Sequence, residues 1–275
     1  MNSQQLANAF KAACMAELEA LKPGNVHIFA DGHGMTVQDF IDSADAVSKV
    51  IAQPDLTLGE RIFQSVQATQ NAVHMNTNLG MILLCAPLIQ AKLKSNGTGL
   101  QANIHAVLGG STIDDAEACF ATIRLANPAG LGNSDTHDVY LPADCTLQVA
   151  MQQAADVDSI ARQYSNNFAD VFDGVVVYQK ALKQWQKPAW AATALHLHFM
   201  RHFLDSHIAR KHNETIAKLV QNQAAEHAVE FSQAFNPKNY QSELLSFDAA
   251  LKKQGLNPGT SADLTVASLF LSAII

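Results

Sequence analysis

Residues 1–21, MNSQQLANAFKAACMAELEAL, carry the pattern that decides the fold. Apolar residues recur here at steps of three and four, which is the spacing of one face of an α-helix. They are Leu6, Phe10, Ala13, Cys14, Leu18 and Leu21. Ser3 stands where a helix cap is expected, so the stretch predicts an amphipathic helix.

The helical period continues along the chain. Further helices are expected over 36–52, 57–73, 78–88, 112–126, 146–154, 157–185, 190–203, 214–231, 242–253 and 262–275. Thr57 and Glu60 form a capping box, and Pro87 predicts a kink or an early stop in its helix. Only Val175-Val176-Val177-Tyr178 has the composition of a strand. The pattern predicts an all-α protein, a single multi-helix globular domain over residues 1–275 with about ten helices.

The composition of the chain excludes or disfavours several classes of protein. The chain has 275 residues, 48% apolar and 16% charged, which excludes a disordered protein. Its net charge of −7 disfavours a protein that grips nucleic acid or an anionic membrane. The start of the chain lacks a signal-peptide pattern, and the longest apolar stretch, 264–275, is too short to span a bilayer. A cytoplasmic protein that binds neither nucleic acid nor membrane is expected.

The four cysteines lie far apart, at positions 14, 85, 119 and 145. They form no C-x-x-C pair, so neither a zinc ribbon nor a disulfide framework is indicated. Buried, reduced thiols are the expectation.

Polar residues gather in the predicted loop that follows the first helix. This loop contains Lys22, Asn25, His27, Asp31 and His33. Together they supply hydrogen-bond donors, acceptors and a titratable base at one place, as an active site requires. A helix C-cap with exposed polar residues is an equally good reading.

A second polar segment, Asn76-Thr77-Asn78, precedes an apolar helix. Free N–H groups at a helix N-terminus suit an anion, although these residues can also serve simply as caps. Further on, Asp158 and Arg162 stand four apart on one expected helix face. They form either a solvated ion pair or, through the carboxylate, a Mg²⁺ site shared with substrate phosphates.

Two late segments and one long loop complete the candidate sites. Arg210 and Lys211 follow Asp205. The two cationic side chains suit phosphate binding, and the carboxylate suits a metal ion. Asn257 and Thr260 precede the last helix. The stretch 127–144 is the longest loop, and such loops in compact domains are usually functional. His198 and His202 have the spacing of zinc ligands, but the Glu of an H-E-x-x-H motif is missing.

Taken together, these segments resemble the triphosphoribosyl-dephospho-CoA synthase family over nearly the whole chain. The resemblance rests on ordered motifs: Lys22-Pro23-Gly24, Asn76-Thr77 with Gly80, Asp205 with Arg210, and Asn257-Pro258-Gly259 with Ala262-Asp263-Leu264. Residues 124–132 and 158–162 look like a divergent branch of the same family.

The resemblance implies an all-α fold and a reaction that joins ATP to 3′-dephospho-CoA and releases adenine. It also implies Mg²⁺ bound with ATP, and small-molecule nucleotide substrates as the partners. Phosphate binding is expected from Lys22, Arg162, Arg210 and Lys211. Mg²⁺ is expected on Asp158 and Asp205, and Asp31 or His33 is expected to be the general base. Substrate contacts are expected from Asn25, His27, Asn76, Thr77, Asn78, Arg124, Asn257 and Thr260.

The chain departs from the citrate-lyase type of the family at two motifs. Where that type has Gly-Ala-His-x-Asp-Met, this chain has Asp31-Gly32-His33-Gly34-Met35. That type reads Asn-Thr-His-Lys-Gly where this chain has Asn76-Thr77-Asn78-Leu79-Gly80. Loss of a phosphate-binding lysine can change the nucleotide or the acceptor. A ribosyl or phosphoribosyl transfer in another coenzyme pathway, such as methanopterin assembly, is the nearest alternative.

Three further expectations stay open. One is a non-catalytic helical protein that binds nucleotides or acts as an adaptor. A zinc hydrolase built on His198 and His202 is another. An apolar helix face could also support a homo-oligomer.

Overall fold

The computed structural model describes residues 1–95, 97–132, 134 and 136–275. Asn96, Asn133 and Asp135, which belong to two of the predicted loops, lie outside the described residues. Within the described ranges the chain forms α-helices and one 3₁₀ turn, and the only β pairing is two isolated bridges. The all-α prediction is therefore confirmed.

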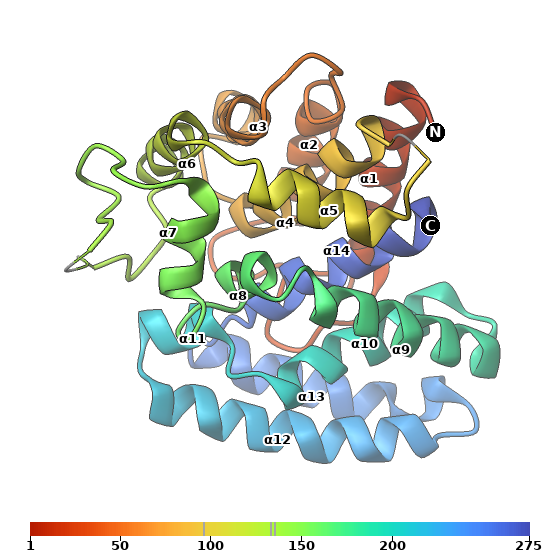
Figure 1. Ribbon diagram of the computed structural model, residues 1–275. Helices are drawn as coiled ribbons and strands as arrows, with labels where there is room; N and C mark the ends of the chain where they lie inside the picture. The colour runs from red at the N-terminus through yellow and green to blue at the C-terminus, as the bar shows by residue number, and fades with distance from the viewer. Residues whose placement is uncertain (96, 133, 135) are drawn as a thin grey trace.

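The helices follow one another in a simple order (Figure 1). The first seven are α1 (Ser3–Glu19), α2 (Val37–Ser48), α3 (Leu58–Val73), α4 (Leu79–Leu93), α5 (Leu100–Gly109), α6 (Ile113–Ala126) and α7 (Leu147–Ala154). The others are α8 (Ser159–Ser165), α9 (Ala169–Trp185), α10 (Pro188–His202), α11 (Ser206–Lys211), α12 (Glu214–Gln233), the 3₁₀ turn η1 (Pro237–Tyr240), α13 (Gln241–Lys253) and α14 (Gly259–Ile274).

Helices α4 and α14 form the centre of the molecule. Both are apolar on nearly every face, a composition typical of buried helices, and almost all of their residues are buried. α14 packs against α1, α4, α9 and α10, and so joins the upper and lower halves of the view in Figure 1. Pro87 does not end α4, which continues to Leu93.

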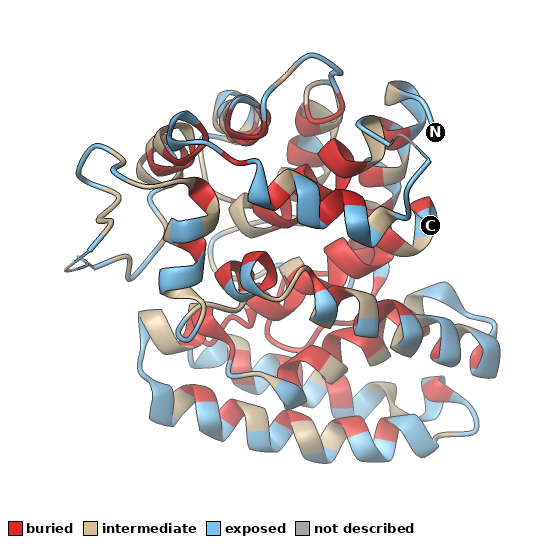
Figure 2. Ribbon diagram, in the orientation of Figure 1, coloured by how far each residue is buried: buried red, intermediate tan, exposed pale blue. Residues whose placement is uncertain are grey.

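The lower half has its own apolar cluster. α12 buries Ala217, Val220, Ala224, Ala228 and Phe231, which recur at steps of three and four. This face packs against α10, while its opposite face is exposed (Figure 2). No described helix has the length and apolarity needed to cross a membrane.

The structure differs from the sequence predictions at several elements. The predicted helix 157–185 is interrupted, because Asn167 and Phe168 adopt left-handed backbone angles between α8 and α9. The strand-like segment Val175–Tyr178 is helical and lies inside α9, so that assignment was wrong. Helices α5 and α11 were not predicted, and the first helix is capped by Asn2 rather than Ser3.

Gly174 on α9 permits the close packing of three helices. A Cβ added there would lie 2.4 Å from Ser268 Oγ on α14 and 2.7 Å from Phe199 Cζ on α10. We therefore expect Gly174→Ala to lower the free energy of unfolding by about 1–3 kcal/mol through overpacking. Urea denaturation measures this change.

Gly109→Ala is the matched control, because a Cβ at this helical position meets only Gln148 Oε1, at 4.0 Å. It should leave stability unchanged or raise it by up to about 1 kcal/mol. Equal effects of the two substitutions would contradict the packing argument.

Candidate active site

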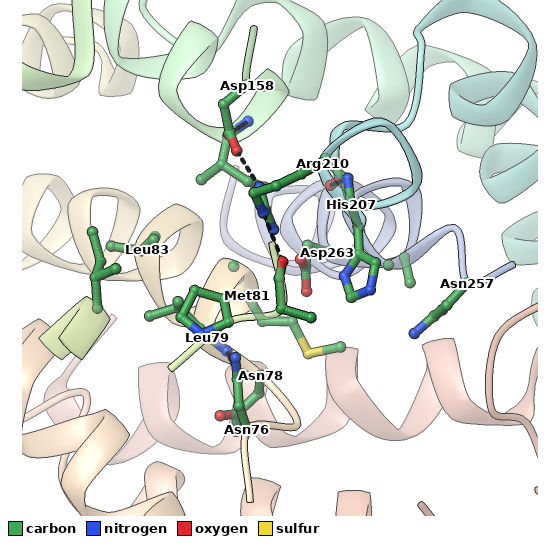
Figure 3. Close-up of a pocket in the computed structure, with 18 of the residues that line it drawn as sticks. Asn76, Asn78, Leu79, Met81, Leu83, Asp158, His207, Arg210, Asn257 and Asp263 are labelled. Carbon is green, nitrogen blue, oxygen red and sulfur yellow. Dashed lines mark hydrogen bonds and ion pairs between the residues drawn. The ribbon is translucent and has the colours of Figure 1, made fainter. Parts of the chain in front are cut away.

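One cavity of about 480 Å³ gathers segments that are far apart in the sequence. It is lined by the loop after α1, the start of α4, the loop after α6, the N-terminal parts of α8 and α14, and residues at both ends of α11. Figure 3 shows labelled side chains converging on it. The cavity brings together these predicted residues: Asn25, His33, Asn76, Thr77, Asn78, Asp158, Arg210, Lys211, Asn257 and Thr260.

A buried carboxylate aligns two of the helices that border the cavity. Asp205 caps α11, where its Oδ1 accepts the N–H groups of His207 and Ile208 at 3.1 and 3.2 Å. Its Oδ2 accepts the N–H and the hydroxyl of Ser261 on α14, both at 2.8 Å. Asp205 therefore fixes the starts of α11 and α14 relative to each other. It does not line the cavity, and four donors already occupy its oxygens.

A cationic wall forms where α8 and α11 meet. Asp158 caps α8 through Oδ1, and its Oδ2 lies 3.1 Å from Arg210 Nη1. Arg210 also donates from Nε to the carbonyl of Ala129 at 3.2 Å. The guanidinium is therefore held from two sides, and it lines the cavity with Lys211 and His207. This wall suits a phosphate chain.

Asp263 contributes a second carboxyl group to the cavity. It lies against Gly80 at the start of α4, where an added Cβ would be 2.1 Å from Asp263 Oδ2. Burial, followed by the negative charges of Glu17, Asp205 and Asp158, raises the pKa of Asp263 well above its ordinary value. A raised pKa favours the protonated carboxyl group, which can donate a proton to a bound substrate.

Lys22 lies beneath the cavity rather than in its lining. It is fully buried and forms an ion pair with Glu17 on α1. Lys22 Nζ donates to Asn25 Oδ1 at 3.0 Å, and Asn25 Nδ2 donates to Asn257 Oδ1 at 2.8 Å. The lysine therefore orients Asn25 and, through it, Asn257, both of which line the cavity.

The two predicted bases occupy different places. Asp31 is exposed and accepts the N–H of Val37 at the start of α2. His33 lines the cavity, and its Nε2 lies 2.7 Å from the carbonyl oxygen of Gly24. Because a carbonyl only accepts, Nε2 carries the proton and Nδ1 is left as an acceptor. Burial lowers the pKa of His33, which favours this neutral form.

The start of α4 borders the cavity as predicted for an anion site. Asn76 Oδ1 accepts the N–H of Leu79 at 3.2 Å. The hydroxyl of Thr77 lies 2.7 Å from that of Ser43, and Asn78 Oδ1 accepts the Thr69 hydroxyl at 2.9 Å. These bonds fix the side chains of all three predicted residues.

Three other predicted residues lie outside the cavity lining. His27 is buried with Nε2 3.4 Å from Asp248 Oδ1. Arg124 pairs with Glu117 at 3.1 Å, and Arg162 pairs with Asp170 at 2.9 Å. Their predicted contacts with substrate remain predictions.

The predicted zinc pair on α10 lacks a third ligand. The rings of His198 and His202 lie 4.2 Å apart between centroids and are tilted by 39°. Among the described residues, no third His, Cys, Asp or Glu joins them in a compact group of ligand atoms.

Sequence reasoning missed Asp263 and His207 as site residues. In the sequence, Asp263 stands out only as part of the resemblance motif Ala262-Asp263-Leu264. Its role depends on α4 and α14 coming together, which no local pattern shows.

A helical chain with a cationic, acid-containing cavity has the features of a nucleotide-dependent transferase. The family model described as ATP:dephospho-CoA triphosphoribosyl transferase matches residues 3–275. The chain belongs to this family.

A solved structure supports the fold. It is the crystal structure of a protein from Archaeoglobus fulgidus provisionally assigned as a triphosphoribosyl-dephospho-CoA synthase. The two are 20% identical with a TM-score of 0.66, over 86% of this chain and 97% of that one, which shows a shared fold. Comparison with curated proteins gives no match.

Gly80→Ala tests the close contact with Asp263. The added Cβ should displace the Asp263 carboxyl group and weaken ATP binding by at least about tenfold. Isothermal titration calorimetry measures the affinity, with Gly109→Ala as the control. Unchanged affinity would show that the nucleotide does not border this contact.

The lowered pKa of His207 predicts that the folded protein loses stability in acid. Burial, followed by the charges of Arg210 and Lys211, lowers the pKa of His207 from 6.5 to about 4. The unfolded chain therefore binds more protons between these pH values, and the free energy of unfolding should fall as the pH falls through this window. The slope is at most about 1.4 kcal/mol per pH unit for one histidine.

Urea unfolding of the wild type and His207→Gln between pH 7 and pH 4 isolates this contribution. The comparison is needed because the raised carboxyl pKa values of Asp205 and Asp263 act in the opposite direction. His105→Gln, at an exposed position on α5, is the control. Identical slopes for the wild type and His207→Gln would contradict the assignment.

Proposed function

We propose that this chain transfers the triphosphoribosyl group of ATP to the ribose 2′-hydroxyl of 3′-dephospho-CoA and releases adenine. The observation that carries the proposal is one cavity that combines Arg210 and Lys211 with the carboxyl group of Asp263, in a chain of this family. Since its substrates are cytoplasmic metabolites, the proposal includes a cytoplasmic location.

The cationic wall, with Arg210 and Lys211, would bind the phosphates of ATP. Arg210 and Lys211 offer several donors to the triphosphate, and the start of α4 borders the same cavity. Mg²⁺ usually takes one or two carboxylates together with substrate phosphates. Asp158 fits this role better than Asp205, because Asp158 lines the cavity and Asp205 does not; the Oδ2 of Asp158, which pairs with Arg210, would turn to the ion. Bound there, Mg²⁺ would neutralise phosphate charge.

His33 and Asp263 would each carry out one of the two proton transfers. His33 Nδ1 accepts the proton of the attacking 2′-hydroxyl, whose oxygen forms a bond to C1′ of the ATP ribose. The C1′–N bond breaks, its electron pair goes to adenine, and Asp263 gives its proton to the departing base. Proton return from His33 to Asp263 through solvent restores both groups, so the reaction consumes no other reactant.

Adenine release from ATP, Mg²⁺ and 3′-dephospho-CoA, followed by chromatography, tests the function. We expect release that depends on the acceptor. A folded protein that binds ATP but releases no adenine with this acceptor would contradict the proposal. Release with a different coenzyme precursor would then establish the related ribosyl transfer, which Asn78 and Leu79 favour as departures from the citrate-lyase motif. Binding with no release for any acceptor would indicate a non-catalytic protein.

Asp263→Asn tests the proton donor in the same assay. We expect kcat to fall by about 10²–10⁴-fold while KM for ATP changes little, because the amide keeps the size of the side chain but cannot donate an acidic proton. Asp114→Asn on the exposed face of α6 is the matched control. A kcat within a few-fold of the wild type would remove Asp263 from this role.

A further inference from the structure

A second group of potential ligands lies outside the cavity lining, just before α7. It consists of His137, Asp144 and Cys145. One ligand atom from each lies within 4.8 Å of the others, and His137 Nδ1 is 2.7 Å from Asp144 Oδ1. It is the one group of three such side chains found among the described residues.

The local structure holds these three side chains together. His137 adopts a left-handed backbone angle, φ 50°, which is uncommon for a residue other than glycine and turns the chain back toward Asp144. The carboxylate of Asp138 then accepts the N–H groups of Ser134 and Tyr140 at 2.9 and 2.8 Å and closes the turn.

The turn is also anchored on α6. Glu117 accepts the N–H of Ala143 at 2.7 Å, next to Asp144. Arg124 donates to the carbonyl of Val139 and pairs with Glu117. The chain between His137 and Asp144 is therefore held on one helix at two points, which keeps the three ligand residues near one another.

The chemical types of the three side chains indicate which metal ion they would bind. A thiolate, an imidazole and a carboxylate together suit Zn²⁺, whereas Mg²⁺ and Ca²⁺ prefer oxygen alone. Bonds of about 2.0–2.3 Å at tetrahedral angles put the ligand atoms about 3.5 Å apart. The ligand atoms lie within 4.8 Å of one another, so ion binding would draw them closer and exchange the hydrogen bond between His137 and Asp144 for bonds to the ion. The Asp144 side chain is 71% exposed, which leaves room for that change. A water molecule would fill the fourth position.

We propose that His137, Asp144 and Cys145 form a zinc-binding site that fixes the loop between α6 and α7. This loop borders the cavity through Asn127–Ala129, Leu131 and Val139. Gly130 in the same loop packs on Arg210, since an added Cβ would lie 2.5 Å from its carbonyl oxygen. Zinc at the turn therefore stabilises the loop that supports the cationic wall. The proposal does not depend on the reaction catalysed.

Zinc binding is measured on the whole protein after removal of metal with a chelator. Equilibrium dialysis against Zn²⁺ and elemental analysis should give one zinc per chain. Cys145→Ser and His137→Gln should each weaken binding by at least about tenfold. His202→Gln, in the histidine pair on α10, is the matched control and should bind zinc as the wild type does. Circular dichroism of the metal-free variants shows whether each is folded.

Two further readouts locate the ion at the thiol. Co²⁺ in place of Zn²⁺ should give a thiolate charge-transfer absorption that Cys145→Ser lacks. Zinc should also slow alkylation of Cys145, measured by mass spectrometry, while Cys14, Cys85 and Cys119 are buried and serve as internal references. Absence of stoichiometric binding to the wild type, equal binding by Cys145→Ser, or loss of binding in His202→Gln would overturn the proposal.

Discussion

The cavity depends on one buried carboxylate, that of Asp205. Three of its four hydrogen bonds satisfy N–H groups that would otherwise be unpaired at the starts of α11 and α14, and the fourth comes from the Ser261 hydroxyl. The arrangement places Arg210 and Lys211 near the end of one short helix, and Thr260 in the first turn of a long one with Asp263 just after it. A single desolvated charge thus sets the distance between the cationic wall and the acidic group.

The proposed chemistry requires, in one cavity, a base that can take up a proton and an acid that carries one. Desolvation lowers the pKa of His33 and raises the pKa of Asp263, so in each case it favours the neutral form. A neutral imidazole accepts a proton and a neutral carboxyl group donates one. The same physical cause therefore produces a base and an acid in one cavity, without a different environment for each.

Much of this arrangement was accessible from the sequence, and the reasons differ from element to element. The apolar spacing predicted α1, α3 and α12 because each buries one face, and the polar segments at helix starts identified much of the cavity lining. Short α11 was missed because its six residues carry too little periodicity. The valines of α9 suggested a strand because they are β-branched, but contacts with α10 and α14 override that preference. Lys22 attracted attention as a charge, yet only the fold shows that Glu17 neutralises it.

The central position of α14 has a consequence for how the protein acquires its structure. This helix follows every element that it packs against, α1 and α4 among them, so a growing chain lacks its centre until that segment has left the ribosome. The apolar faces of the earlier helices stay uncovered during that time, and the contacts that cover them span most of the chain length. Folding of these helices is therefore expected to wait for the synthesis of α14, and chaperones have that interval in which to bind the nascent chain.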